Sequence, residues 1–178
     1  MMTLVVGGSA SGKSEYAEGL ILSAKGWPRT YIATMQPFDE ECLRRIEKHR
    51  LMRASKSFET VECYTDLASV TVPGGAVLLE CMSNLCANEM YSSQGSGENA
   101  EPAVLKGVEH LRRQCTDLVI VSNEVFSGGS RWQGDTLRYL ELLGRVNCAL
   151  AAMADNVCEV VYGVPVYYKG GEPSDAAV

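Results

Sequence analysis

Three features typical of membrane, secreted and nucleic-acid-binding proteins are missing from this sequence. No apolar run approaches the length of about 20 residues that a membrane-spanning helix needs, and the four-residue apolar stretch near the start is too short for a secretory signal. A net charge of −6 and a pI near 5.0 argue against nucleic acid or an anionic membrane surface as the main partner. The composition predicts an ordinary soluble globular protein without a membrane span.

Paired cysteines and clustered histidines are also lacking. The seven cysteines, at positions 42, 63, 81, 86, 115, 148 and 158, include no C-x-x-C spacing, and there are only two histidines. A zinc site therefore has little support. Cys81 and Cys158 stand inside apolar runs, which indicates small buried side chains. Free thiols fit a reducing cytoplasm, where we expect this protein to work.

The sequence does contain a complete phosphate-binding loop at Gly7–Ser14, with the pattern Gly, four residues, then Gly-Lys-Ser. Its glycines allow successive backbone N–H groups to turn onto phosphate oxygens. Lys13 brings a cation to the outer phosphates, and the hydroxyl of Ser14 is placed to bind Mg²⁺. The loop follows an apolar run at 3–6 and precedes a helix start, which is itself an anion site. We therefore predict that the chain binds a nucleoside triphosphate.

Apolar runs of strand length alternate with segments of helical period along the chain. The strands are predicted at 3–6, 29–34, 76–81, 118–122 and 158–162, and the helices at 15–24, 39–53, 83–91, 103–115 and 136–154. This alternation predicts a three-layer α/β fold with a mostly parallel sheet and helices on both faces. We expect one catalytic domain at 1–168 and a flexible C-terminal tail at 169–178.

Acidic residues at strand ends are the candidates for the second magnesium ligand, because ligands in such sheets collect at the carboxyl ends of strands. Glu80 directly follows three apolar residues and is the better candidate, with Glu124 second. The alternative for Glu80 is a strand-end carboxylate that faces solvent. The Gly-rich stretch at 126–134 also follows a strand, which fits either a lid over the site or an ordinary long loop.

The second unusual segment is a basic helix at 43–53, which holds five of the sixteen Lys and Arg residues of an acidic protein. Arg45, His49 and Arg53 share one helix face by their spacing of four. A histidine among so many positive charges should resist protonation, and a neutral imidazole is a phosphorus nucleophile. The alternative is a solvated charged face with an uninvolved histidine.

In this combination the chain resembles the adenosylcobinamide kinase/adenosylcobinamide-phosphate guanylyltransferase family, which are bifunctional enzymes of cobalamin biosynthesis. The resemblance runs from residue 1 to about residue 168. Its blocks are residues 7–14, 31–34, 45–50, 78–81 and 122–125, with further matches at 58–62 and 144–151. Many families share the loop alone, whereas the loop, the histidine helix and the Asn-Glu-Val block in this order are much more specific.

The resemblance implies two reactions on one substrate. ATP or GTP phosphorylates adenosylcobinamide, and GTP then guanylylates a histidine, which falls on His49, with loss of pyrophosphate. Adenosylcobinamide phosphate takes the GMP to give adenosylcobinamide-GDP. The resemblance also implies a RecA-like P-loop NTPase fold and a homotrimer. Because a corrinoid is large compared with the nucleotide pocket of one subunit, we expect the acceptor site at a subunit interface.

The candidate site follows from the loop chemistry and the resemblance together. The catalytic candidates are His49 and Lys13, and the candidate Mg²⁺ ligands are Ser14 and Glu80. Nucleotide contacts are expected at Gly7, Gly8, Ser9, Ala10, Ser11, Gly12, Lys13, Ser14, Ala33, Thr34, Met35, Arg50, Leu51, Met52, Arg53, Glu62 and Glu80. The chain departs from the family where Phe126 replaces a glycine and Tyr139-Leu140-Glu141 replaces Phe-Arg-Asp, which bears on corrinoid binding or trimer contacts.

Two other functions remain open at this point. One is a small-molecule kinase of the P-loop class with another acceptor, which would need neither His49 nor its basic helix. The other is a non-catalytic nucleotide-binding regulatory module. Such a module needs a segment that senses the γ-phosphate, for which only the stretch at 126–134 is a candidate.

Overall fold

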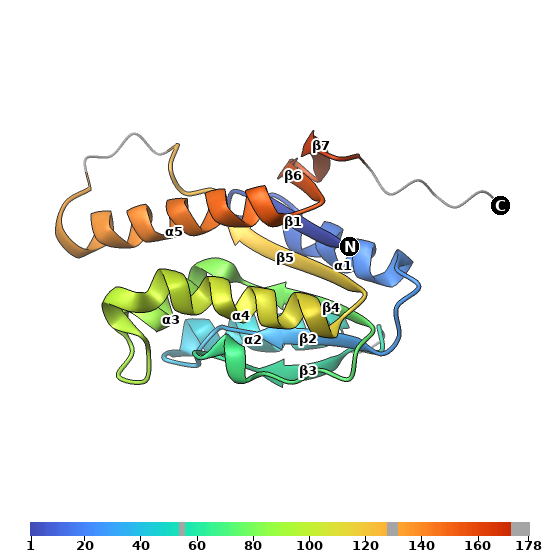
Figure 1. Cartoon of the computed structure of the whole chain (residues 1–178), viewed down its shortest axis with the longest axis horizontal. Helices are drawn as coiled ribbons and strands as arrows, with labels where there is room; N and C mark the ends of the chain where they lie inside the picture. The colour runs from blue at the N-terminus through green and yellow to red at the C-terminus, as the bar shows by residue number, and fades with distance from the viewer. Residues whose placement is uncertain (54–55, 128–131, 172–178) are drawn as a thin grey trace.

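The chain folds around one central sheet (Figure 1). The computed structural model describes residues 1–53, 56–127 and 132–171, and the side chains of Arg45, Lys48, His49, Met52 and Arg53 also lie outside the description. The strands are β1 (Met2–Gly7), β2 (Arg29–Ala33), β3 (Glu59–Glu62), β4 (Ala76–Glu80), β5 (Asp117–Asn123), β6 (Asn156–Val161) and β7 (Val164–Lys169). The helices are α1 (Lys13–Ser23), α2 (Glu40–Arg53), α3 (Met82–Tyr91), α4 (Ala100–Gln114) and α5 (Gly134–Met153), with short 3₁₀ turns at Leu67–Ser69 and Gly97–Asn99.

The seven strands of the described ranges pair in the order β3-β2-β4-β5-β1-β6-β7. Each neighbouring pair is parallel except β6 with β7. All five residues of β4 are buried, and β1 and β5 are buried along most of their length. Interior strands of a parallel sheet are covered on both faces, which explains why they appear in the sequence as continuous apolar runs.

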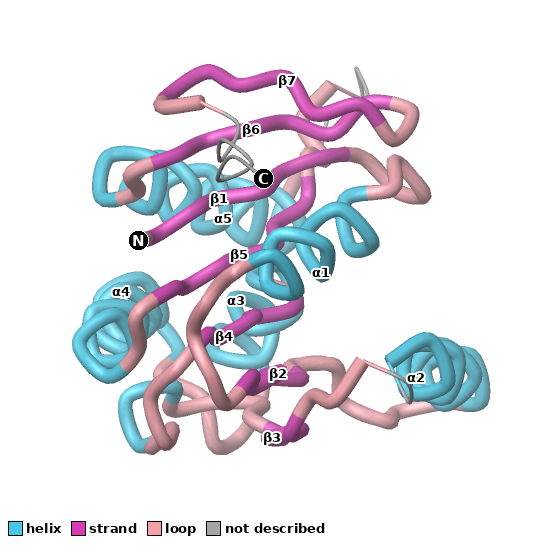
Figure 2. The backbone as a smooth tube through the Cα atoms, turned by 90° about the vertical axis from the view of Figure 1, so that its right-hand side faces the viewer, coloured by secondary structure: helices cyan, strands magenta, loops and turns pink. Residues whose placement is uncertain are grey.

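Helices cover both faces of the sheet (Figure 2). Helices α3, α4 and α5 lie on one face, where Leu79 and Leu143 belong to the larger hydrophobic core. Helix α1 lies on the other face, over a smaller core that includes Ile21 and Leu78. The sequence-based prediction of a three-layer, mostly parallel α/β fold is confirmed.

Two strands were not predicted from the sequence, and both lie at edges of the sheet. β3 has four residues, of which none is buried, and β7 is a mostly exposed antiparallel strand. β3 lacks the apolar run that marks an interior strand, and Pro165 interrupts the run in β7. Lys169, the first residue of the predicted tail, ends β7, and its Nζ donates to the carbonyl oxygens of Ala151 and Ala152 at 3.2 and 3.0 Å. The tail from 172 onward lies outside the described residues.

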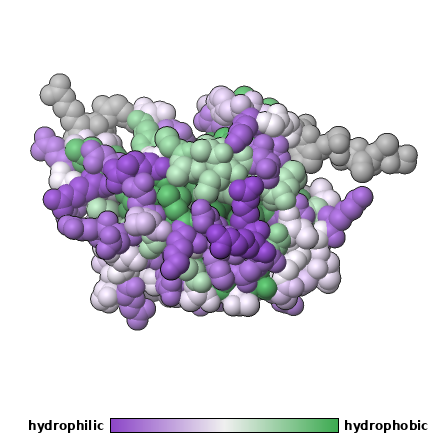
Figure 3. Space-filling model, in the orientation of Figure 1, coloured by the Kyte–Doolittle hydropathy of each residue, from purple (hydrophilic) through white to green (hydrophobic). Residues whose placement is uncertain are grey.

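The outer surface of the α3–α5 layer is mixed in character. Figure 3 shows a hydrophobic area over α5 among hydrophilic side chains. Arg145 of α5 pairs with Glu101 of α4, with Nε and Oε2 2.7 Å apart, which ties the two helices at the surface. In the described ranges no helix is both long enough and apolar enough to pass through a bilayer.

Candidate nucleotide site

The phosphate-binding loop is seated between the interior strand β1 and the turn that joins β6 to β7. Gly7 ends β1, and a Cβ atom there would lie 2.8 Å from the carbonyl oxygen of Val160. Gly12 has a φ of +90°, a conformation that favours glycine. The N–H of Gly163 donates to the carbonyl oxygen of Ser11 at 2.8 Å. The backbone of the loop is therefore held from two sides.

The loop runs directly into the N-terminus of α1, which begins at Lys13. The first amides of a helix have no partners within the helix, and its dipole makes that end favourable for anions. The Nζ of Lys13 donates to the carbonyl oxygen of Gly8 at 3.0 Å, so the cation curls back over the same loop. The loop, the helix end and the lysine together form a positively polarised cradle of the kind that binds phosphate.

A cavity of about 490 Å³ opens beside this loop. The predicted site residues that line it are Ser9, Ala10, Ser11, Gly12, Lys13, Ser14, Ala33, Met35, Arg50, Glu62 and Glu80. The fold thus brings the loop together with the carboxyl ends of β2, β3 and β4 and with α2. The cavity lining does not include Gly7, Gly8, the buried Thr34 or Leu51, which is 67% exposed. His49, Met52 and Arg53 lie on α2 with side chains outside the description.

Glu80 and Ser14 meet at one point of the cavity wall. The hydroxyl of Ser14 donates to Oε1 of Glu80 in a very close contact, and the hydroxyl of Tyr31 donates to Oε2 at 3.3 Å. Glu80 is only 9% exposed, so its carboxylate does not face solvent. Two oxygen donors side by side suit Mg²⁺, which takes one or two protein ligands and completes its shell with phosphate oxygens and water.

Glu124, the second candidate acid, has a different position. Its Oε1 accepts hydrogen bonds from the backbone N–H groups of Phe126 and Ser127 at 2.8 and 3.2 Å. The carboxylate therefore caps the turn that follows β5 and does not line the cavity. The Gly-rich stretch proposed as a lid or a loop includes 128–131, which lie outside the described residues.

The cavity also has lining residues that the site prediction did not name, among them Tyr31, Thr60, Tyr64, Asn84 and Asn123. Asn84 and Asn123 follow or end strands, so the strand-end rule was a signal for them. Tyr64 carried no such signal. Its hydroxyl donates to Oε2 of Glu62 at 2.9 Å, and burial, followed by this hydrogen bond, raises the pKa of Tyr64.

Helix α2 reaches the cavity from the surface. Ile46 and Arg50 line the cavity, and Nη2 of Arg50 lies 3.0 Å from Oε1 of Glu62 on β3. After the helix, Lys56 pairs closely with Glu18, whose side chain is 1% exposed on α1. None of the described side chains of α2 is buried. Among the side chains that the structure describes, those near the C-terminal end of the helix make polar contacts with the rest of the molecule.

A family of known enzymes shares this combination of loop, strand ends and helix. The sequence profile of the family described as cobinamide kinase / cobinamide phosphate guanyltransferase matches residues 3–168. The chain belongs to this family.

Individual relatives agree with the family match. The chain is 35% identical to the "Bifunctional adenosylcobalamin biosynthesis protein CobU" of Salmonella typhimurium and 34% identical to the protein of the same name in Escherichia coli, covering 95% of this chain and 100% of each relative. It is 30% identical to the "Bifunctional adenosylcobalamin biosynthesis protein CobP" of Pseudomonas aeruginosa, covering 96% of this chain and 98% of that relative. The resemblance inferred from the motifs is confirmed.

Solved structures support the fold assignment. The flagellar accessory protein FlaH from Methanocaldococcus jannaschii superposes with a TM-score of 0.50 at 10% identity, covering 96% of this chain and 78% of that chain. A prototypical ATPase from the type III secretion system of pathogenic bacteria superposes with a TM-score of 0.55 at 8% identity, covering 93% and 56%. At such low identity these likenesses concern the fold alone, and they agree with a RecA-like P-loop NTPase fold.

A tyrosine of α5 lies behind the site. The hydroxyl of Tyr139 donates to the carbonyl oxygen of Ser83 at 3.2 Å. Burial raises the pKa of Tyr139 to about 12. The hydroxyl of Ser83 in turn accepts a hydrogen bond from Nδ2 of Asn123 at 2.6 Å, and Asn123 lines the cavity. The hydroxyl of Tyr139 thus links α5 to the start of α3 behind the cavity wall.

Proposed function

We propose that this protein phosphorylates adenosylcobinamide with ATP or GTP and then transfers GMP from GTP to adenosylcobinamide phosphate, giving adenosylcobinamide-GDP and pyrophosphate. The observation that carries the proposal is the family match over residues 3–168. The cavity supports it, because the phosphate-binding loop lines one part and Arg50 of α2 another. The relatives' name, bifunctional adenosylcobalamin biosynthesis protein, also supports two activities.

The loop supplies the grip on the triphosphate in both reactions. In the kinase reaction the acceptor hydroxyl attacks the γ-phosphorus, the bond between that phosphorus and the β-phosphate oxygen breaks, and the hydroxyl proton passes to water. In both reactions negative charge grows on the leaving phosphate groups. Lys13 and the loop amides stabilise that charge, and such electrostatic stabilisation supplies most of the rate enhancement in phosphoryl transfer. Mg²⁺ bound at Ser14 and Glu80 would neutralise part of the phosphate charge.

His49 is the proposed nucleophile of the second reaction. The lone pair of its neutral imidazole attacks the α-phosphorus of GTP, a P–N bond forms, and the P–O bond to pyrophosphate breaks. A phosphate oxygen of the acceptor then attacks the same phosphorus and displaces the imidazole. His49 follows Ile46 by three residues and immediately precedes Arg50, and both of these neighbours line the cavity, which supports this role.

The histidine intermediate can be tested by labelling the protein with GTP that carries an isotope at the α-phosphate, in the presence of Mg²⁺. We expect a label that is lost in acid and kept in base, as for a phosphoramidate, and complete loss of labelling in His49→Ala. His110→Ala is the matched control, because His110 lies on α4 and does not line the cavity. Absence of label on the wild-type protein, or a label that persists in His49→Ala, would contradict the proposal.

Three further parts of the proposal rest on separate grounds. We infer a single catalytic domain at 1–168 from the chain length and the extent of the resemblance, a homotrimeric assembly from the resemblance, and a cytoplasmic location from the free cysteines. The seven free cysteines of the described residues are compatible with a reducing compartment.

A further inference from the structure

A second cavity, of about 610 Å³, lies next to the nucleotide cavity, between the start of α2 and the end of α3. The residues that line it are Gln36, Pro37, Phe38, Tyr64, Ala87, Asn88, Tyr91, Ser92, Ser93 and Gln94. Three of them are aromatic and none is charged. The hydrogen-bonding groups of this cavity are therefore amides, hydroxyls and backbone.

The two cavities share a wall. Tyr64 lines both, and the consecutive residues Met35 and Gln36 line one cavity each. Nδ2 of Asn88 donates to the carbonyl oxygen of Thr34 at 2.8 Å, at the carboxyl end of β2. A ligand in the second cavity therefore lies directly beside the nucleotide, at the edge of the sheet where the loop holds the phosphates.

The aromatic side of the second cavity is exposed and held in place. Phe38 is 76% exposed and Tyr91 is 53% exposed. Pro37 restricts the backbone, and the N–H of Phe38 donates to the carbonyl oxygen of Gln36 at 3.0 Å, which closes a tight turn. The hydroxyl of Tyr91 donates to the carbonyl oxygen of Asp135 at 2.7 Å. Exposed aromatic rings on a restricted backbone are typical of a ligand surface.

The lining chemistry discriminates between the two substrates of the proposed reactions. A second nucleotide needs cations or converging backbone amides around its phosphates, and no lining residue of this cavity is a Lys or Arg. A corrinoid is a flat ring edged with methyl groups and neutral amide arms. Aromatic faces suit the ring, and amide and hydroxyl side chains suit its arms.

We propose that this cavity, called here the aromatic cavity, binds the corrinoid acceptor, with its hydroxyl arm passing Tyr64 into the nucleotide cavity. The inference rests on the proposed function and deepens it by naming the acceptor subsite. The corrin ring lies against Phe38 and Tyr91, and its amide arms bond to Gln36 and Gln94. A whole corrinoid exceeds about 610 Å³, so the aromatic cavity holds the edge of the ring from which the hydroxyl arm extends.

The test compares Phe38→Ala with Trp27→Ala in the full-length protein. Both rings are largely exposed, at 76% and 64%, but Trp27 precedes β2 and Phe38 follows it, so only Phe38 lies at the site edge of the sheet. We expect Phe38→Ala to raise the KM for cobinamide in the kinase reaction about tenfold, as for loss of one aromatic contact. Histidine labelling by GTP should stay within about twofold of wild type, and Trp27→Ala should change neither.

Direct binding gives a second readout. Equilibrium dialysis without nucleotide measures the Kd for cobinamide directly, with cobinamide detected by its visible absorbance. We expect this Kd to rise about tenfold in Phe38→Ala, as the KM does. A smaller rise, about threefold, is expected for Gln94→Ala, since it removes one exposed hydrogen-bonding group. Because Gln94 is exposed, we expect Gln94→Ala to fold normally, so it still tests the acceptor subsite if Phe38→Ala folds poorly.

Each outcome has one meaning. Unchanged KM and Kd in both variants would overturn the acceptor subsite, even with normal labelling by GTP. A change in sedimentation of Phe38→Ala with unchanged cobinamide binding would mean that Phe38 contacts a second copy of the chain and not the corrinoid, which also overturns the subsite. A wild-type protein that takes no label from GTP would instead contradict the proposed function.

Discussion

The phosphate-binding loop and helix α2 approach the same nucleotide cavity but are held by different forces. The loop continues from β1, an interior strand in which Leu4 and Val5 are completely or almost completely buried. Hydrophobic burial of that strand therefore sets the position of Gly7–Ser14. Helix α2, which carries His49, has no buried residue among its described side chains. Its described ion pair with Glu62 is polar and exposed, so among the described side chains the two halves of the site differ in how much hydrophobic burial holds them.

The two ion pairs near the C-terminal end of α2 differ in strength. Arg50 and Glu62 are 55% and 49% exposed, and an exposed pair contributes about 0–1 kcal/mol. Lys56 is 26% exposed, whereas its partner Glu18 is 1% exposed. Within the described residues, Oε1 of Glu18 has no hydrogen-bond partner. The second pair therefore compensates a buried charge and matters more for stability.

The largest effect is expected on the loop side of this comparison, from Lys13→Ala. Loss of the cation should reduce histidine labelling by GTP about a thousandfold, at the upper end of what one removed charge-stabilising donor costs. Thermal unfolding should change little, because the loop backbone is held by β1 and by the bond from Gly163 to Ser11. Lys25→Ala, which removes an exposed lysine just beyond α1, is the matched control. Unchanged labelling in Lys13→Ala would show that the loop does not position the triphosphate.

A smaller effect separates the two ion pairs beside α2. Lys56→Met leaves the Glu18 carboxylate buried and unpaired, and should lower the free energy of unfolding by about 2–3 kcal/mol, somewhat less than a fully buried pair because Lys56 is partly exposed. Histidine labelling of Lys56→Met at saturating GTP should stay within about threefold of wild type.

Arg50→Met should show the reverse. We expect its free energy of unfolding to change by less than about 1 kcal/mol and its histidine labelling to be about tenfold lower than wild type. Denaturant titration measures the free energy of unfolding, and the labelling assay measures the reaction with GTP. Equal changes in Lys56→Met and Arg50→Met would contradict the proposed difference between the two ion pairs.

Hydrophobic burial also explains how much of the fold could be predicted from the sequence. Each of the five predicted strands lies inside the sheet, where a continuous apolar run marks it. β3 and β7 were missed because an edge strand is covered on fewer sides and its composition is not distinctive. The phosphate-binding loop was predicted residue by residue, since its chemistry is local and contiguous.

The remainder of the site arises from contacts between distant segments. Tyr64 lies in no motif, and it reaches both cavities only because β3 pairs beside β2. The aromatic cavity combines the segment after β2 with the end of α3, more than 50 residues later in the chain. The hydrophobic pattern of a segment predicts the helix or strand that the segment forms, but it does not show which distant segments will lie beside it. The location of α2 is equally unpredictable from its own sequence, because its contact with Glu62 joins residues of two separate elements.

The smallest expected effect concerns the core between the sheet and α3–α5, and the way in which the free energy of unfolding depends on pH. Burial raises the pKa of the Cys86 thiol from its usual 9.0 to about 12, and Cys86 belongs to the core between the sheet and α3–α5. Below pH 9 the thiol is protonated in both the folded and the unfolded chain. As the pH rises from 9 toward 12, only the unfolded chain ionises, so the stability contributed by the neutral buried thiol is lost over that window.

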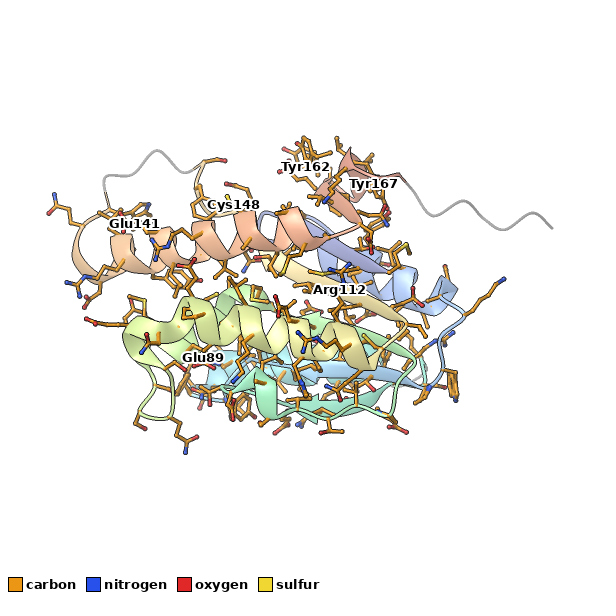
Figure 4. All side chains as sticks on the ribbon, viewed as in Figure 1. Glu89, Arg112, Glu141, Cys148, Tyr162 and Tyr167 are labelled. Carbon is orange, nitrogen blue, oxygen red and sulfur yellow. The ribbon has the colours of Figure 1, made fainter. Side chains whose placement is uncertain are left out.

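For Cys86 alone this linkage corresponds to a fall of about 1 kcal/mol in the free energy of unfolding between pH 8 and pH 10. Denaturant titrations at the two pH values should show a smaller fall for Cys86→Ala than for wild type, although Cys86→Ala is less stable at both. Cys148→Ala is the matched control, since Cys148 lies exposed on α5 (Figure 4) and its removal should leave the fall unchanged. If Cys86→Ala and Cys148→Ala respond alike, the thiol at Cys86 ionises without unfolding, and the core under α3 opens to solvent within the folded protein.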